Sequence, residues 1–413
     1  MKKTFNLLLV KVFSAGLTYV SNALITNSFS TTEAGYYFLF TTLIIIFSGI
    51  SRLGFEIQSI KVVALHNVHG EKDAIRNYIN KTIVLLIIFD LIMAVPLTIV
   101  TAYFVKSAVA VYLVGVTMVC FAIKDVISAM LRGLQKYYHA GFILNSSVPL
   151  VLTILCGIFF FIKKGYNPYY FFFFGCLFSF VMGTAFLVRN KVLSFSFKDK
   201  IDLRALTKTI DVNKYLITIS LMGINFLPNI LVGTFLNVQS VAVFTVISRT
   251  SLIISYIYIA VESYIAPKIA SHHVLGEVSE IRRLLVRLSK LSFAVSTIVV
   301  FLAIYFSKTI MHFFGKQYTE FYLLFDMMAI AQYLNVLTGS AGTFMIMTNR
   351  DVIVRNVYFF TIGGIIVLLP IAGHFGNLTI AVGVYSALII CYNVSLTLIA
   401  KFKFDMRSTF LMP

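Results

Sequence analysis

Charged residues inside long apolar runs are the residues of this sequence that could do chemistry. A charge at the centre of a membrane helix costs roughly 2.5–3.5 kcal/mol, so such a residue faces water, pairs with another charge or reaches an interface. A buried cation can bind an anionic group, and a buried carboxylate can exchange a proton or bind Na⁺. Eight residues have this placement: Lys11, Arg52, Glu56, Asp90, Lys124, Asp125, Arg249 and Glu262.

The four cations are candidates for binding an anionic substrate in a hydrated lumen. Arg249 lies about nine residues from the outer end of its segment, roughly 13 Å deep, and either faces the lumen or pairs with an acidic neighbour. Arg52 could instead anchor the cytoplasmic interface, and Lys11 could extend to it. Lys124 and Asp125 are adjacent, hence about 100° apart on a helix, and we expect no direct pair between them.

The four acids are candidates for ion coupling. Asp90 and Glu262 lie deep enough in apolar segments to exchange a proton or bind Na⁺, and Glu56 and Asp125 are further candidates. The alternative for each is a structural pair with a nearby Arg or Lys.

The segment 215–236 contains a candidate gate. Pro228 would interrupt a helix there, and Asn225 and Asn229 share one helix face at a spacing of four residues. A kinked polar helix suits a moving gate, and the alternative is a kink that serves packing.

Long apolar segments must position these residues. The chain has 413 residues, 59% of them hydrophobic and only 12% charged, which excludes an ordinary soluble protein. A membrane-spanning helix needs about 20 apolar residues. On that measure we predict an all-α membrane protein with twelve transmembrane helices, the first of them retained rather than cleaved as a signal peptide: 5–28, 35–62, 80–103, 108–131, 140–162, 168–188, 215–236, 240–265, 290–313, 321–347, 357–374 and 378–400.

The basic residues predict the orientation. With the N-terminus inside, cytoplasmic loops hold 25 Lys and Arg and outer loops hold five. Positive residues concentrate on the cytoplasmic side, so both termini are predicted to be cytoplasmic. The net charge of +18 therefore reports orientation, and we expect no nucleic-acid partner.

Two cytoplasmic stretches are similar at a separation of 206 residues. The stretches 64–76 and 270–282 share seven identical pairs, among them His66 and His272, and the same shift places Glu56 on Glu262. We predict two six-helix lobes related by a parallel repeat, an arrangement found in alternating-access transporters. The lobes are an N-lobe at 1–207 and a C-lobe at 208–413, joined by a basic linker over 189–214.

The sequence contains no motif that predicts catalysis. It has no Walker loop, GxSxG, HExxH or CxxC motif, and its four cysteines lie in apolar runs without metal-ligand spacing. We expect no enzyme activity, no cofactor and no metal. The short outer loops leave little room for a catalytic outer domain.

Several motifs resemble the polysaccharide-flippase branch of the multidrug/oligosaccharidyl-lipid/polysaccharide exporter superfamily, and most of all Wzx-type O-antigen flippases. They are Glu262-Ser-Tyr-Ile-Ala-Pro267 followed by Gly276-Glu, Phe313-Phe-Gly-Lys-Gln-Tyr318, Phe344-Met-Ile-Met-Thr-Asn-Arg350 and Ala129-Met-Leu-Arg-Gly-Leu-Gln135.

The resemblance implies a function in the bacterial cytoplasmic (inner) membrane. Such a protein moves an undecaprenyl-pyrophosphate-linked oligosaccharide, for O-antigen or a similar surface polysaccharide, to the outer leaflet and could act beside polysaccharide polymerase machinery. Coupling to H⁺ or Na⁺ is expected. The pyrophosphate would bind lumen cations, for which Arg249, Arg52, Lys11 and Lys124 are the candidates. Related lipid II flippases use lumen arginines in helices 2 and 8, which Arg52 and Arg249 match by helix.

Two other functions stay open. A drug/cation antiporter of the same superfamily would favour an acidic cavity, whereas this chain carries basic candidates. A membrane polymerase or ligase of lipid-linked sugars would need larger outer loops.

Overall fold

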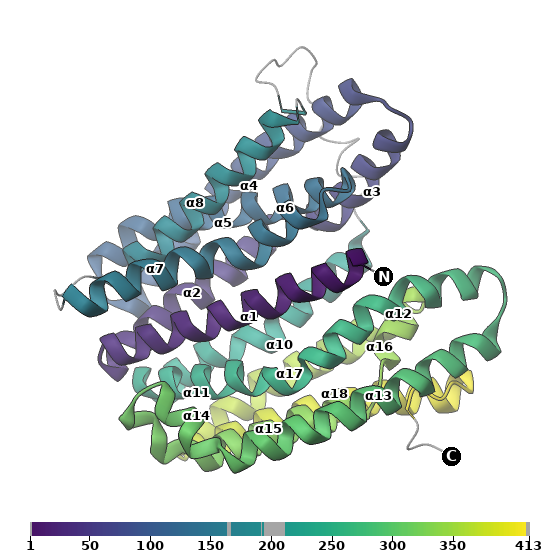
Figure 1. The fold of residues 1–413 in the computed structure, drawn as a ribbon. Helices are drawn as coiled ribbons and strands as arrows, with labels where there is room; N and C mark the ends of the chain where they lie inside the picture. The colour runs from purple at the N-terminus through teal and green to yellow at the C-terminus, as the bar shows by residue number, and fades with distance from the viewer. Residues whose placement is uncertain (1, 163–166, 191, 194–210, 410–413) are drawn as a thin grey trace. The chain divides into compact units, whose positions relative to one another are not determined.

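The computed structural model describes residues 2–162, 167–190, 192–193 and 211–409, which Figure 1 shows as a ribbon. Side chains are described from residue 13 onward, except at 160–162, 257, 259, 260, 263, 264 and 267. Most of the expected linker 189–214 therefore lies outside the described residues, as does the Lys11 side chain. The described residues form helices and turns and contain no β-strand.

The chain forms two compact units, residues 1–215 (the N unit) and 216–413 (the C unit). The predicted division into lobes at 207 and 208, and their relation as a parallel repeat, stay predictions. In the N unit, α5 lies at the centre and packs against α2, α3, α4 and α8. Its helices are α1 (Lys2–Ser28), α2 (Thr31–Ser51), α3 (Phe55–Val68), α4 (Lys72–Val105), α5 (Ala108–Gly133), α6 (Tyr137–Gly141), the π-helical η1 (Phe142–Ser146), α7 (Ser147–Ile162) and α8 (Pro168–Arg189).

The C unit is built mainly around α15, which packs against α11, α13 and α18. The helix α10 begins at the end of the N unit and runs into the C unit. The helices of this half are α10 (Val212–Phe235), α11 (Val238–Ser251), the 3₁₀ turn η2 (Leu252–Ser255), α12 (Tyr256–Val274), α13 (Val278–Tyr305), α14 (Ser307–Phe313), the 3₁₀ turn η3 (Lys316–Phe321), α15 (Tyr322–Leu337), α16 (Ala341–Met347), α17 (Asp351–His374) and α18 (Leu378–Phe404).

The helices have the length and outer surface of membrane helices. Ten are long and apolar enough to cross a membrane, or eleven if the bent pair Lys316–Leu337 and Ala341–Met347 forms one span, within the described residues. Large apolar side chains such as Tyr112, Phe360 and Phe402 are exposed on helix surfaces. That exposure suits a lipid surround, since lipid tails are as apolar as these side chains. The all-helical membrane fold is confirmed at this level, and the number of twelve stays a prediction.

Two of the predicted segments are interrupted by residues with a left-handed φ. The segment 35–62 is divided between α2 and α3, where Leu53 and Gly54 take left-handed φ angles of 50° and 80°. The segment 321–347 bends by 46° between α15 and α16, where Gly339 has a φ of 70°. Glycine is the residue that tolerates such φ angles without strain. Both breaks lie beside buried carboxyl groups.

Candidate polar sites in the two units

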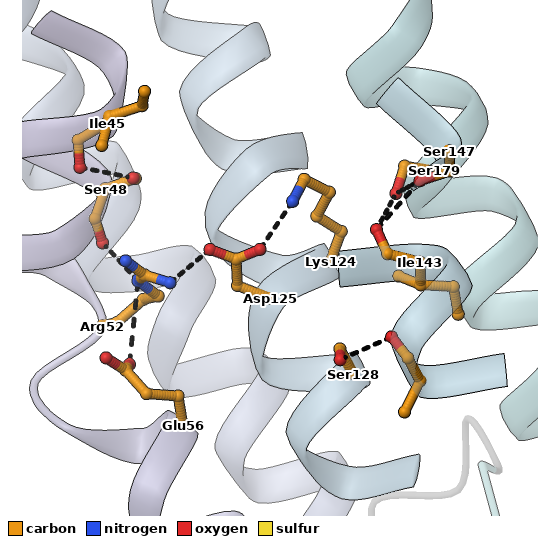
Figure 2. A network of polar contacts seen from close by, with 11 residues as sticks. Ile45, Ser48, Arg52, Glu56, Lys124, Asp125, Ser128, Ile143, Ser147 and Ser179 are labelled. Carbon is orange, nitrogen blue, oxygen red and sulfur yellow. Dashed lines mark hydrogen bonds and ion pairs between the residues drawn. The ribbon is translucent and has the colours of Figure 1, made fainter. Parts of the chain in front are cut away.

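A buried network of ionic groups lies at the break between α2 and α3. Arg52 caps the C-terminus of α2; its Nε donates to the Ser48 carbonyl at 3.1 Å, and its Nη1 donates to Asp125 Oδ2 on α5. The same Nε lies 3.7 Å from Glu56 Oε2 at the start of α3. Lys124 Nζ donates to the second oxygen of Asp125 at 2.6 Å. Figure 2 shows the Asp125 carboxylate between the two cations, Arg52 and Lys124.

The pair of Lys124 and Asp125 corrects the sequence expectation, which excluded a direct contact between neighbours on a helix. The angle between Cβ directions limits short side chains, but the four-carbon stem of lysine is long enough to bring its ammonium back to the adjacent carboxylate. The ammonium also lies 4.1 Å from the centre of the Phe121 ring. Both contacts are made without water, because Lys124 is only 1% exposed.

The network balances its own charge. Two cations (Arg52 and Lys124) face two acids (Glu56 and Asp125), and Arg132 in the last turn of α5 acts electrostatically on both acids. Arg52 is 4% exposed, so its charge is compensated by protein groups rather than by solvent. In this conformation both Arg52 and Lys124 therefore donate hydrogen bonds to Asp125. Neither side chain is available to bind an anionic substrate.

Asp90 is the most deeply buried acid of the N unit. It lies near the middle of α4, has no exposed surface, and neither carboxyl oxygen has a hydrogen-bond partner among the described residues. Ser51 and Arg52 on α2 are the polar groups that act on it. The Ser51 hydroxyl, however, donates to the Ser48 carbonyl at 3.0 Å. A carboxylate in this position would lack the donors that a buried charge needs.

Glu262 on α12, the residue that the shift of 206 places on Glu56, is a partly buried acid of the C unit. Tyr258 donates its hydroxyl to Glu262 Oε1 at 2.8 Å, and Thr343 on α16 donates to the same oxygen. Tyr258 also lies 3.3 Å from the carbonyl of Gly339, in the break between α15 and α16. No described Lys or Arg forms an ion pair with Glu262. Hydroxyl donors therefore take the place of the cations found in the N unit.

The turns that follow α3 and α12, predicted to be cytoplasmic, are closely similar. His66 Nδ1 lies 2.6 Å from Glu71 Oε2, and His272 Nδ1 lies 2.6 Å from Glu277 Oε2. The glycine before each glutamate has a left-handed φ, 72° at Gly70 and 74° at Gly276. The shift of 206 residues that aligns the sequences thus also aligns a local structure.

The remaining predicted residues do not join these sites through any contact described. Arg249 lies in the last turn of α11, partly exposed, and acts electrostatically on Tyr256. In α10, Asn225 is exposed and donates to the Leu221 carbonyl at 2.8 Å, whereas Pro228 and Asn229 are buried. The helix α10 continues from Val212 to Phe235 through Pro228.

Sequence reasoning missed Tyr258, Thr343 and Arg132. Tyr258 could have been found, because the shift of 206 residues places it on Arg52 and both residues lie four positions before the shared glutamate. Arg132 was assigned to a loop, although α5 extends past it to Gly133. Nothing in the sequence marks Thr343, which reaches Glu262 from 81 residues away.

Comparisons with known proteins bear on the fold. No protein-family model and no curated protein sequence matches the chain. Among solved structures, an inward-facing multidrug resistance MATE family transporter of the MOP superfamily aligns with a TM-score of 0.72 at 12% identity, over 96% of this chain and 99% of that one. This chain has the MATE transporter fold.

Two further solved structures share this fold. A MOP superfamily transporter from Pyrococcus furiosus, described as having a binding pocket of reverse polarity, aligns with a TM-score of 0.65 at 13% identity, over 97% of this chain and 94% of that one. An outward-facing multidrug resistance MATE family transporter aligns with a TM-score of 0.60 at 12% identity, over 96% of each chain. At these identities the likeness concerns the fold alone.

Proposed function

We propose that this chain is a membrane transporter that works by alternating access. The observation that carries the proposal is the MATE transporter fold, which extends over 96% of the chain and is known in inward-facing and outward-facing forms. The larger number of basic residues in the predicted cytoplasmic loops supports a cytoplasmic location for both termini. The twelve predicted spans would give each of the two lobes six helices. We place the protein in the bacterial cytoplasmic membrane, where transport is coupled to H⁺ or Na⁺.

The proposed substrate is an undecaprenyl-pyrophosphate-linked oligosaccharide, moved to the outer leaflet. The motif resemblance supports this assignment, and so does the state of the three candidate cations whose side chains the structure describes. Arg52 and Lys124 are neutralised by Asp125, whereas Arg249 is partly exposed at the end of α11. A cation about 4 Å from a phosphate contributes roughly 4 kcal/mol at an effective dielectric near 20, before desolvation. Arg249 is therefore the proposed pyrophosphate ligand.

The second candidate function is a drug/cation antiporter. Two of the structures that share the fold are described as multidrug resistance transporters. In the C unit, Glu262 is an acid without an ion-paired cation among the described residues, a feature that would suit a cationic substrate.

Replacement of Arg249 separates the two functions. In a bacterium deleted for this gene, we expect wild-type protein to restore surface polysaccharide, Arg249→Ala to abolish it, and Arg249→Lys to restore part of it. Arg283→Ala is the matched control, because Arg283 is an exposed arginine of the same unit. Lipid-linked oligosaccharide should accumulate in the Arg249→Ala cells at unchanged protein levels.

The opposite result would support the antiporter. Unchanged surface polysaccharide in the Arg249→Ala strain, together with greater sensitivity to cationic drugs after gene deletion, would refute the flippase assignment. Reporter fusions after residues 165 and 200 test the orientation, and an outside signal at 200 would invert it.

A further inference from the structure

The outward face of α13 changes from basic to apolar along the helix. Arg287 and Lys290 are exposed in its first half, and the exposed positions that follow are apolar or aromatic. Five of these later side chains are more than half exposed: Leu291, Ile298, Phe301, Leu302 and Tyr305. Apolar helix surface of this kind faces lipid tails, so the change after Lys290 places the two cations at the level of the lipid headgroups.

The charges of Arg287 and Lys290 are not compensated by their own helix. Within the described residues, neither side chain forms an ion pair or a hydrogen bond. Glu280 is the only acid of α13, and its Oε1 accepts from Arg283 Nη1 at 2.9 Å. The donors of Arg287 and Lys290 are therefore open to a ligand from outside the protein.

The C-terminal tail, residues 405–409, lies along the same part of α13. Arg282 Nη2 donates to Asp405 Oδ2 at 2.7 Å, and the Ser289 hydroxyl donates to the Thr409 hydroxyl at 3.3 Å. The two contacts are seven residues apart on α13, so they hold the tail beside two turns of the helix. They also pair Asp405, the only acid of the tail, with Arg282.

The tail brings a third exposed cation to this end of the C unit. Met406 and Ser408 are buried, and the Ser408 hydroxyl donates to the Thr338 carbonyl at 3.2 Å. Arg407 lies between these two anchored residues and is exposed. Because the tail is fixed on both sides of it, Arg407 is presented to the surroundings beside the basic part of α13.

The helix that the repeat places on α13 does not carry the same charges. The shift of 206 residues places Lys81 of α4 on Arg287, but Val84 on Lys290. Basic residues in the cytoplasmic loops are expected of both halves. That general rule accounts neither for the second cation at the start of the apolar face nor for the anchored Arg407.

We propose that Arg287, Lys290 and Arg407 form a binding site for the headgroup of an anionic phospholipid, in the leaflet that holds the N-terminal end of α13. This leaflet is the cytoplasmic one in the predicted orientation. Each basic residue near a membrane surface favours anionic lipid by about fivefold. The site requires that the protein lies in a membrane, but it does not depend on which substrate is transported.

A phospholipid fits this surface better than free phosphate does. The three cations are exposed, so a free anion beside them would stay largely hydrated and screened by salt. The tails of a phospholipid pack against the apolar face that begins at Leu291, and they keep the phosphate next to the cations.

Fluorescence quenching by brominated lipid tests the site, because the sequence contains no tryptophan. Leu291→Trp places one reporter beside Lys290 in the full-length protein. In vesicles with the same lipid mixture in both leaflets, we expect brominated phosphatidylglycerol to bind at this position at least about fivefold more tightly than brominated phosphatidylcholine. Phe301→Trp, about 15 Å further along the same helix, is the matched control and should show nearly equal binding.

Variants of the three cations assign the preference to them. In the Leu291→Trp protein, combined Arg287→Gln, Lys290→Gln and Arg407→Gln should bring the binding ratio of the two lipids close to one, and each single change should lower it in part. Lys316→Gln removes the same charge from an exposed lysine of η3 and should leave the ratio unchanged.

Three results would overturn the proposal. Equal binding of the two lipids at Leu291→Trp would show that there is no anionic preference, and an unchanged ratio in the triple variant would assign it to other groups. Loss of the preference with sodium phosphate, but not with sodium chloride of the same ionic strength, would identify a site for free phosphate instead.

Discussion

The two units hold two glutamates, 206 residues apart in the sequence, by different means. In the N unit, Glu56 lies beside Arg52, within a network of four charged groups. In the C unit, Glu262 is held by the hydroxyls of Tyr258 and Thr343. Position 52 and position 258 are equivalent under the shift of 206 residues, so a change from arginine to tyrosine replaces ionic compensation by hydrogen bonding.

This difference has an energetic consequence. Removing one member of a buried ion pair leaves the other charge uncompensated, whereas removing charge from a hydrogen-bonded acid leaves its acceptor in place. Stability should therefore be sensitive to neutralisation of the ion-paired Asp125 in the N unit, and tolerant of neutralisation of Glu262 in the C unit.

The largest expected effect is that of Asp125→Asn, which leaves Arg52 and Lys124 without their shared counter-charge. We expect a loss of about 3–5 kcal/mol in stability. Glu262→Gln, which keeps an oxygen to accept from Tyr258 and Thr343, should cost about 1 kcal/mol or less. The midpoint of thermal unfolding of the purified protein measures both changes.

Asp73→Asn is the control for this comparison, because the Asp73 side chain is 96% exposed in its pair with Arg76. Its midpoint should equal that of the wild type. If Glu262→Gln lowered the midpoint as much as Asp125→Asn, the ion-paired and the hydrogen-bonded acid would not differ in their response to loss of charge.

An intermediate effect should come from the glycines at the two helix breaks. Gly339→Ala forces a side chain into a left-handed φ of 70° and against the backbone carbonyl of Ser408, so we expect a cost of about 3 kcal/mol. Gly54→Ala at a φ of 80° should cost about 1–2 kcal/mol from the φ angle.

Gly363→Ala on α17 serves as the matched control, since no atom lies within 4 Å of an added Cβ there. Alanine favours the helix by up to about 1 kcal/mol over glycine, so this variant should gain stability. If Gly54→Ala and Gly339→Ala lowered the midpoint of thermal unfolding equally, the clash of the added Cβ with the Ser408 carbonyl would contribute nothing to the cost at Gly339.

The smallest effects should come from the turns after α3 and α12, where the two units agree. His66→Ala and His272→Ala each remove one partly exposed pair, worth about 0.5 kcal/mol or less. The two variants should give midpoints that are the same within error. A difference in stability above about 1 kcal/mol between the two variants would show that the two turns are not equivalent.

Local features of the chain were predictable from residues near one another. The apolar runs predicted helices, and the similarity of 64–76 to 270–282 anticipated matching turns, because both depend on neighbours in sequence. The expectation for Lys124 and Asp125 was wrong because it used the helix angle and neglected the length of the lysine stem. The break after Arg52 was overlooked, although Gly54 stands there, because the apolar run continues across it.

By itself, the sequence determined which segments are apolar helices, where the basic loops lie and which residues carry charge into the helices. Hydrophobicity and turn-forming residues act over a few positions, so these features need no knowledge of the fold. Only the tertiary structure decided how each buried charge is compensated. Asp125 meets Arg52 across 73 residues and Glu262 meets Thr343 across 81, because α5 packs against the end of α2 and α12 against α16.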